Sequence, residues 1–174
     1  MTGVQTCALP ILRNERGINT SLNYASFGDP DEKRLRSVLD AKNNTTSYEY
    51  DLLGNLTRVD SPQGNDRVFT YNSKNFLISE SHPEGGTTAF GHDEIGNVTS
   101  KKKADGSSVG FHYDGLNRLT LVDRPPGEDD VIFDYDDAGN RTLMDSGSNS
   151  YSYSFQYDQS NRLKRQEVTV GNII

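Results

Sequence analysis

Aspartate is the residue type whose spacing in this sequence most suggests chemistry. The regularly spaced aspartates are Asp51, Asp93, Asp114, Asp136 and Asp158. Carboxylates could bind calcium, which needs several oxygen ligands within a short span. Asp134, Asp136 and Asp137 come closest to such a loop but lack the distal Glu of an EF-hand. Because the spaced aspartates all fall at one turn position, we interpret them as backbone caps and expect no metal and no cofactor.

The other candidate chemical residues do not form a catalytic or metal motif. His82 lies beside a predicted turn, His92 replaces a repeated tyrosine, and His112 stands between two aromatic residues, without HxxxH or HExxH spacing. The single cysteine, Cys7, excludes an internal disulfide framework and a cysteine-based zinc site. The sequence also has no Walker loop and no GxSxG elbow. We therefore predict that the protein is not an enzyme.

Composition narrows the possible partners. The 174 residues carry a net charge of −7, which argues against nucleic acid and anionic membranes as partners. No apolar run is long enough to span a bilayer. Only 32% of residues are hydrophobic and the mean hydropathy is −0.75, which by itself would favour disorder. The repeats described next argue instead for ordered structure.

The aspartates belong to a repeat with steps of 21, 21, 21, 22 and 22 residues. The repeated pair occurs as Tyr50-Asp51, Tyr71-Asn72, His92-Asp93, Tyr113-Asp114, Tyr135-Asp136 and Tyr157-Asp158. Three residues after each Asp or Asn stand Gly54, Asn75, Gly96, Asn117, Gly139 and Asn161. Glycine and asparagine adopt left-handed backbone most readily, and Asp or Asn can accept bonds from backbone N–H groups ahead of it. We therefore predict a chain reversal at each position, called here a Tyr-Asp turn, and take these residues as the structural repeat positions.

A second set of turns lies half a period away. These half-period turns are marked by Asn43, Gly64, Gly85, Gly106, Gly127, Asn149 and Gly171. Between the two sets, aromatic residues occur in pairs two apart, such as Phe111 with Tyr113 and Phe133 with Tyr135. Residues two apart share a face of a strand, so stacked repeats are expected to align their rings as cross-strand ladders. Strands of about 6–8 residues should result.

The residue after the left-handed position alternates along the chain. It is Asn55, Phe76, Asn97, Arg118, Asn140 and Arg162 in turn. The alternation therefore indicates that two successive hairpins form one larger unit of about 42–44 residues, which is close to the length of a propeller blade. The half-units are nearly equivalent, however, and no blade signature is present. We predict an all-β fold of tandem antiparallel hairpins that form a continuous curled sheet, a partial β-shell.

The segments YDLLGNLTRV, YDGLNRLTLVDRP and YDDAGNRT resemble the YD repeats of the RHS family, which also occur in Tc toxin complexes and teneurins. The resemblance covers about Asp29 to Ile174 and implies a hollow shell that encloses a C-terminal toxin domain of the same polypeptide. It also implies a secreted or bacterial cell-surface protein of the polymorphic toxin class. The acidic self-cleavage site of the family's core region has no match here. The alternative function is an extracellular module that binds carbohydrate or protein at a cell surface.

The chain divides into three segments by sequence. Residues 1–11 (MTGVQTCALPI) look like translated sequencing adapter and are set aside, the alternative being a disordered N-terminus. Residues 12–28 form a leading segment with a partial repeat, and 29–174 form the array, which we expect to be truncated at its C-terminus. Asp29-Pro30 stands where a Tyr-Asp pair is due, so the first repeat is degenerate.

Overall fold

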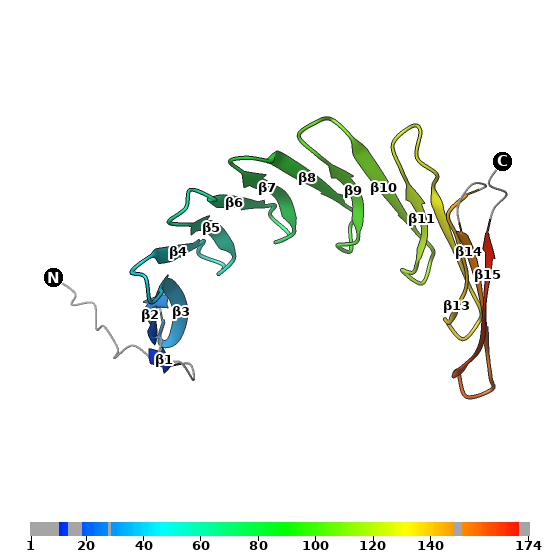
Figure 1. Cartoon of the computed structure of the whole chain (residues 1–174), viewed down its shortest axis with the longest axis horizontal. Helices are drawn as coiled ribbons and strands as arrows, with labels where there is room; N and C mark the ends of the chain where they lie inside the picture. Colours follow the sequence, from blue (N-terminus) through cyan, green and yellow to red (C-terminus); the bar gives the residue numbers. More distant parts are fainter. Residues whose placement is uncertain (1–10, 14–18, 28, 148–150, 171–174) are drawn as a thin grey trace. The chain divides into compact units, whose positions relative to one another are not determined.

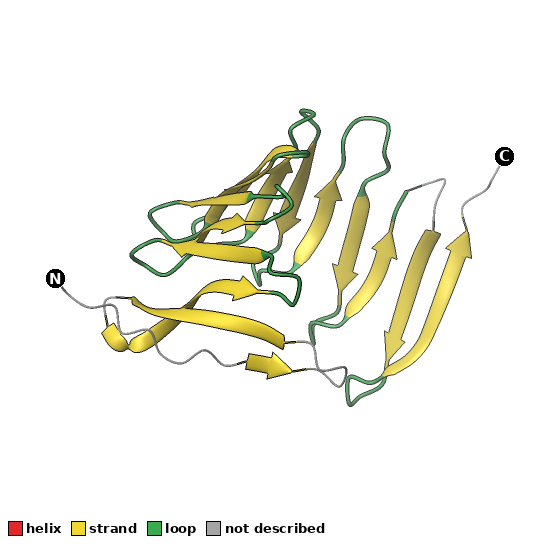
Figure 2. Cartoon of the chain, turned by 60° about the vertical axis from the view of Figure 1, so that its left-hand side comes forward, coloured by secondary structure: helices red, strands yellow, loops and turns green. Residues whose placement is uncertain are grey.

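The computed structural model describes residues 11–13, 19–27, 29–147 and 151–170. Every regular element in these ranges is a β-strand (Figure 2), and none is a membrane-spanning apolar helix. The prediction of an all-β fold built from antiparallel hairpins is confirmed. Of the segment that we set aside, residues 1–10 lie outside the described residues, and Ile11 begins the first strand.

The chain divides into two compact units, residues 1–87 and 88–174. In the first unit, neighbouring strands are antiparallel and their hydrogen-bonded order follows the sequence. Its strands are β1 (Ile11–Arg13), β2 (Asn19–Phe27), β3 (Asp29–Leu39), β4 (Thr45–Tyr50), β5 (Leu56–Asp60), β6 (Arg67–Tyr71) and β7 (Leu77–His82) (Figure 1).

The second unit has the same organisation and begins within β8. Its strands are β8 (Gly86–His92), β9 (Val98–Lys102), β10 (Ser108–Tyr113), β11 (Leu119–Asp123), β12 (Val131–Tyr135), β13 (Arg141–Asp145), β14 (Tyr151–Tyr157) and β15 (Leu163–Val170). Within the unit, successive strands pair in sequence order, from β8 with β9 to β14 with β15. A grouping into separate four-stranded propeller blades is therefore wrong for this unit.

Each Tyr-Asp hairpin contains a β-bulge that the repeat pattern did not predict. In the β10–β11 hairpin, Tyr113 pairs with Leu119 but His112 pairs with Leu121, which leaves Thr120 as the extra residue. The same shift occurs directly before the aromatic residue of the other five hairpins. The Thr120 hydroxyl donates to the carbonyl oxygen of His112 at 3.2 Å. Because a bulge bends its strand and increases twist, the bulges give every hairpin the same local distortion.

Within each unit the sheet is a single layer with almost no enclosed core. Among the described residues, Val131 at 3% exposure is the one buried apolar side chain. Other large apolar residues remain open to solvent, and Leu52 at the tip of a turn is 96% exposed. Since a sheet needs a second layer to bury one of its faces, the order of these units depends heavily on hydrogen bonds between strands and at turns.

The first hairpin departs from the repeat, as its degenerate sequence predicts. Asp29 and Pro30 lie inside β3 instead of forming a Tyr-Asp turn, and Leu35 pairs with Tyr24. Two features of the turn are missing here: proline replaces the capping Asp or Asn, and Lys33 occupies the left-handed position. Proline offers no acceptor side chain, and lysine enters the left-handed region only with strain.

Candidate functional site

The Tyr-Asp turns share one set of hydrogen bonds. In the first of them, the Asp51 carboxylate accepts from the backbone N–H groups of Leu53 at 3.0 Å and Asn55 at 2.9 Å. The Gly54 N–H donates to the Asp51 carbonyl oxygen, and the Asp51 N–H donates to that of Asn55, both at 3.0 Å. The carboxylate thus satisfies donors that a five-residue reversal would otherwise leave exposed.

The same arrangement recurs in the other Tyr-Asp turns. Asn72 accepts from the N–H groups of Lys74 and Phe76 at 3.0 and 2.9 Å, so an amide oxygen can replace the carboxylate. The remaining turns are capped by Asp93, Asp114, Asp136 and Asp158. Left-handed backbone, with φ between 58° and 100°, occurs at Gly54, Asn75, Gly96, Asn117, Gly139 and Asn161. Every predicted repeat position therefore lies in or next to one of these turns.

The half-period turns are less uniform. Positive φ occurs at Asn43, Gly64, Gly106 and Gly127, where the sequence placed these turns. In the third turn, however, Gly86 has positive φ (68°) and the expected Gly85 does not. Asn149 and Gly171 lie outside the described residues. The described residue Gly147, two positions before Asn149, has a φ of 90°.

Hydrogen bonding shifts the acidity of the capping carboxylates. The side-chain amide of Asn55 and, against opposing burial, backbone N–H groups lower the pKa of Asp51 below its usual value. The amide of Asn140 does the same for the pKa of Asp136. At Asp114 the backbone N–H and then the guanidinium of Arg118 lower the pKa. These carboxylates are thus held in their charged, acceptor form, which is the form the turn needs.

Four of the repeated tyrosines link their hairpin to the previous one. The Tyr135 hydroxyl donates to the carbonyl oxygen of Leu119 at 2.8 Å, sixteen residues earlier. Equivalent bonds join Tyr71 to Leu56, Tyr113 to Val98 and Tyr157 to Arg141, at 2.9 to 3.0 Å. The acceptor is always the first residue of the strand that leaves the preceding turn. The hydroxyl, and not only the ring, therefore has a defined structural partner, which the aromatic pattern alone did not reveal.

The rings do not form purely aromatic ladders. Across the strands of the second unit, Phe111 pairs with Val122 and Phe133 pairs with Met144, and Met144 then pairs with Tyr153. In these hairpins an aromatic strand faces an aliphatic one, so aromatic and aliphatic side chains alternate along the row, whereas Phe69 pairs with Glu80 and Phe90 pairs with Lys101. The expectation of cross-strand aromatic stacking is wrong at these positions for that reason.

Arginines occupy several of the ring faces instead. The Arg118 guanidinium lies 4.7 Å from the ring centre of Tyr135 on the next hairpin. The Arg34 guanidinium, at the equivalent position of the repeat, lies 5.6 Å from the ring centre of Tyr50 on its next hairpin. Arg141, the one residue that breaks the aliphatic pattern after the turns, lies 5.9 and 5.0 Å from the rings of Phe133 and Phe155. These distances are within the range of cation–π attraction. The contacts with two rings explain why an arginine replaces the usual aliphatic residue at position 141.

Asparagine forms a second kind of link between successive turns. The Asn140 side-chain amide donates to Asp136 of its own turn and to Asn161 of the next turn, both at 3.0 Å. Asn97 reaches Asn117 at 3.4 Å, and Asn55 donates to Asn75 in the same way. We call this an Asn joint. It connects a turn with glycine in the left-handed position to a following turn with asparagine there.

Arg118 forms the complementary link, which we call an Arg joint. Its Nε donates to Asp114 of its own turn at 2.7 Å, and its Nη1 donates to the carbonyl oxygen of Asp136 in the next turn at 3.1 Å. This joint connects a turn with asparagine in the left-handed position to a following turn with glycine. The alternation along the sequence thus corresponds to two physically different joints, with Phe76 in the arginine position of the second turn, and two hairpins make one repeating unit.

The comparison with protein families decides which group these repeats belong to. A model described as the Teneurin YD-shell matches residues 11–174. The chain belongs to the YD-shell family. This membership gives the repeats a structural role as part of a shell. No curated protein matched the chain by sequence.

Solved structures agree with the fold of this YD-shell chain. The Photorhabdus luminescens Tc holotoxin pore matches with a TM-score of 0.64 and 12% identity over 88% of this chain and 10% of that one. The crystal structure of TcdB2-TccC3-Cdc42 matches with the same TM-score and 15% identity over 88% of this chain and 11% of that one. The YD-shell chain therefore spans about a tenth of the length of these matched chains.

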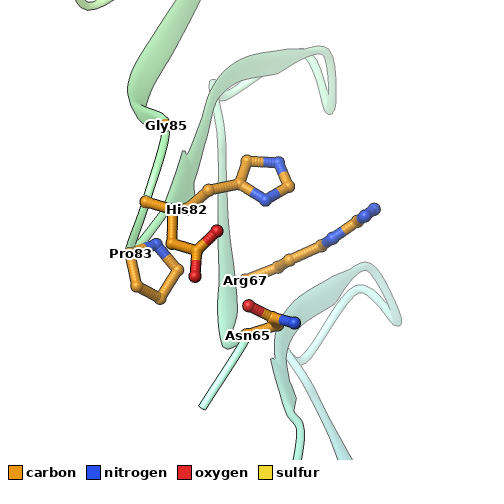
Figure 3. A pocket seen from close by; sticks show the side chains of 6 residues that line it. Asn65, Arg67, His82, Pro83 and Gly85 are labelled. Atoms are coloured by element: carbon orange, nitrogen blue, oxygen red, sulfur yellow. The ribbon is translucent and has the colours of Figure 1, made fainter. Parts of the chain in front are cut away.

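The first unit of the YD-shell chain also contains a small polar pocket at its half-period turns (Figure 3). Its volume is about 390 Å³, and it is lined by Asn65, Arg67, His82, Pro83, Glu84 and Gly85. His82 Nε2 lies 2.8 Å from a Glu80 carboxylate oxygen, and Arg67 lies 3.7 Å from the same oxygen. Within the described residues, no three His, Cys, Asp or Glu side chains gather as metal ligands.

Proposed function

We propose that this chain is a wall segment of a shell that encloses a C-terminal toxin domain of the same polypeptide. The observation that carries the proposal is the link between successive hairpins by tyrosine hydroxyls and turn joints. These links add hairpins one after another without needing a buried core, which suits a thin wall better than a compact domain. The likeness to TcdB2-TccC3, which has also been solved without a hypervariable C-terminal region, supports this reading.

The function of such a wall is mechanical. It separates an enclosed domain from solvent and proteases until release, and no step of bond chemistry is required of the residues in the sheet. The partner is then the toxin domain itself, and the protein acts outside the cytoplasm, secreted or at the bacterial surface. Both of these statements follow from the family resemblance and form part of the proposal.

Protease protection tests this function. The full polypeptide that contains this segment should be digested alongside its C-terminal domain prepared separately, and the cleavage rates of that domain compared. We expect the enclosed domain to be cut at least about tenfold more slowly, since cleavage then needs the wall to open. Equal cleavage rates for the enclosed and the free domain would refute encapsulation.

A matched pair of variants links protection to the turns. Gly139 has a φ of 86°, whereas Gly115 is outside the left-handed region, and a Cβ at either position would meet nothing within 4 Å. In the full polypeptide, Gly139→Ala should therefore reduce protection of the enclosed domain while Gly115→Ala should not. Equal protection in both variants would show that the wall does not depend on this turn geometry.

The pocket supports a second candidate function, binding of a cell-surface carbohydrate. Its lining offers an amide, a guanidinium, an imidazole and a carboxylate, a mixture of donors and acceptors that matches sugar hydroxyls. A glycan array would test this candidate, with Arg67→Ala and His82→Ala as variants. Binding that these substitutions abolish would favour the carbohydrate function, and binding that they leave unchanged would exclude this pocket.

A further inference from the structure

One face of strands β11, β12 and β13 combines an apolar centre with carboxylates. Ile132 of β12 pairs with Leu121 of β11 on one side and with Asp145 of β13 on the other, and cross-strand partners share a face of a sheet. Residues two positions along each strand lie on that same face. We call this surface the acidic face, and it consists of Leu121, Asp123, Ile132, Asp134, Leu143 and Asp145.

The acidic face is open to solvent. Its central Ile132 is 48% exposed, and two of its three carboxylate side chains are exposed as well. On the neighbouring strands, Gly110 of β10 pairs with Asp123 and Ser152 of β14 pairs with Asp145, so small residues flank two of the carboxylates. An exposed apolar patch with a polar rim is typical of a surface that binds another protein.

Other strands of the repeat show what normally stands beside such a carboxylate. In each strand that leaves a Tyr-Asp turn, the third and fifth residues lie on one face. In β5 these are Arg58 and Asp60, and in β15 they are Arg165 and Glu167. Both pairs form a salt bridge. The strands β7 and β9 have no acid at the fifth position.

In β11 and β13 the acid remains but the arginine is replaced. The third and fifth residues are Leu121 and Asp123 in β11, and Leu143 and Asp145 in β13. Within the part of the chain that the structure describes, none of the three carboxylates of the acidic face forms a salt bridge. The place that a guanidinium fills in β5 and β15 is therefore taken by an apolar side chain here.

The charge of the acidic face selects among possible partners. A second copy of the chain that docked through the same face would bring like charges together, which is unfavourable. A metal ion would leave the apolar centre uncovered, and no three metal-ligating side chains gather among the described residues. A polypeptide that carries both arginines and an apolar residue would satisfy the whole surface, because guanidinium groups pair with carboxylates.

We propose that the acidic face is a docking surface for an arginine-bearing, partly apolar segment of a partner polypeptide. The guanidinium groups of the segment pair with Asp123 and Asp145, as the strand's own arginine pairs with the acid in β5 and β15. Its apolar residue covers Ile132. The acidic face contributes nothing to the Asn and Arg joints, so this interaction goes beyond the wall function and does not depend on it.

An NMR titration of the full chain with a short peptide tests the proposal. In the probe, arginine, leucine and arginine alternate with serines, so that all three can face the sheet when the peptide is extended. We expect amide shifts to concentrate in β11, β12 and β13. A control peptide with glutamine in place of arginine should bind several-fold more weakly. Added salt should weaken the arginine peptide more than the control, since exposed ion pairs are screened.

Leu121→Arg combined with Leu143→Arg provides the sharpest variant. It restores the arginine found in β5 and β15, so the carboxylates become paired within their own strands and the apolar centre shrinks. The affinity for the probe should fall by at least about fivefold, the loss expected for two exposed ion pairs and an apolar contact. The matched control is Leu52→Arg with Leu53→Arg, which adds the same charge at exposed leucines of the first unit and should leave the probe's affinity nearly unchanged.

Three results would overturn the proposal. Equal loss of affinity in the variant and its matched control would place the peptide elsewhere on the chain. Equal affinity of the arginine and glutamine peptides would show that the carboxylates do not recognise the partner. Shifts confined to the first or last strand would assign the peptide to strand addition at a sheet edge. Protease protection of the C-terminal domain is measured separately, so this docking surface and encapsulation can fail independently.

Discussion

The Tyr-Asp turns and the half-period turns reverse the chain equally often, but they differ in how strictly they are built. All six Tyr-Asp turns have five residues between their strands, from 51–55 to 158–162. The half-period turns range from three residues, at 83–85, to seven, at 124–130. Differences in repeat length are therefore absorbed outside the Tyr-Asp turns.

The reason lies in what each turn contacts. Within each unit, successive Tyr-Asp turns bond to each other through an Asn or Arg joint, so a change in the length of one would displace its neighbour as well. Half-period turns are closed mainly within themselves. Asp66 accepts from the Ser61 N–H at 2.9 Å, and Asp130 accepts from that of Arg124 at 2.8 Å. A turn whose hydrogen bonds are internal can vary in length without disturbing the rest of the sheet.

Acid should have the largest effect on stability, and it should act on both kinds of turn. In the half-period turns, side-chain hydrogen bonds from Asn44 and Ser107 lower the pKa of Asp40 and Asp105. Hydrogen bonds lower the pKa of Asp51, Asp114 and Asp136 below the usual 3.8, so these groups favour the folded state above that value. The contribution is lost as pH falls through the folded-state pKa values, because the unfolded chain then binds more protons. We expect the thermal unfolding midpoint to fall as the pH decreases below about 4.

The Asp93 turn refines the acid prediction. Burial there raises the pKa, but bonds from Asn97 and the N–H groups of Ile95 and Gly96 outweigh it and leave the pKa lowered. Carboxyl titration by NMR should show the capping aspartates titrating below ordinary ones. An unfolding midpoint that stays constant over the acid range would contradict the role assigned to these carboxylates.

Backbone strain should produce the next largest effect. Gly139→Ala places a side chain on left-handed backbone and should lower the free energy of unfolding by roughly 1–2 kcal/mol. The control Gly115→Ala lies in the same type of turn outside the left-handed region and should have little effect. Chemical denaturation measures both. A loss of stability that is equal in the two variants would mean that φ is not the cause.

Removing a tyrosine hydroxyl should have a smaller effect. Tyr135→Phe deletes the bond to the Leu119 carbonyl oxygen and should cost about 1 kcal/mol of unfolding free energy. Tyr48→Phe is the matched control, since Phe69 and Phe111 occupy its position in other repeats. Denaturation of both variants tests whether the hydroxyl or the ring matters. A larger loss for Tyr48→Phe would reverse our assignment.

Lengthening a half-period turn should have the smallest effect. Two glycines inserted after Glu128, in the seven-residue loop, should change the free energy of unfolding by less than about 1 kcal/mol, since loop-closure entropy grows slowly with length. The same insertion after Leu53 should be clearly more destabilising because it breaks the Asp51 cap. Similar losses at both sites, measured by thermal unfolding, would remove the distinction between the two kinds of turn.

Most of the fold could be predicted because its signals are local. A left-handed residue three places after Asp or Asn specifies a reversal wherever it occurs, so strand order followed from residues such as Gly54 and Asn75. Where that local signal weakens, at Asp29-Pro30, the turn is absent. Gly85 and Gly86 are adjacent, and either glycine can adopt positive φ, so the sequence did not indicate that Gly86 is the one that does.

The contacts between hairpins were harder to predict. The alternation of Asn55, Asn97 and Asn140 with Phe76, Arg118 and Arg162 was visible in the sequence. What the asparagines do depends on a partner about twenty residues away. The same holds for Arg141, whose ring partners Phe133 and Phe155 lie on neighbouring strands. Periodicity shows that such residues recur, and it does not show which atoms meet.

The sequence by itself determined where this chain turns, that it forms antiparallel strands, and that two hairpins make one repeat, because backbone preference and side-chain capping act within a few residues. The tertiary structure alone decided that Tyr135 bonds to Leu119, that Thr120 forms a bulge, and that Arg118 reaches the next turn. Those contacts depend on strand register and on the spacing between hairpins, which become fixed only when the strands pair.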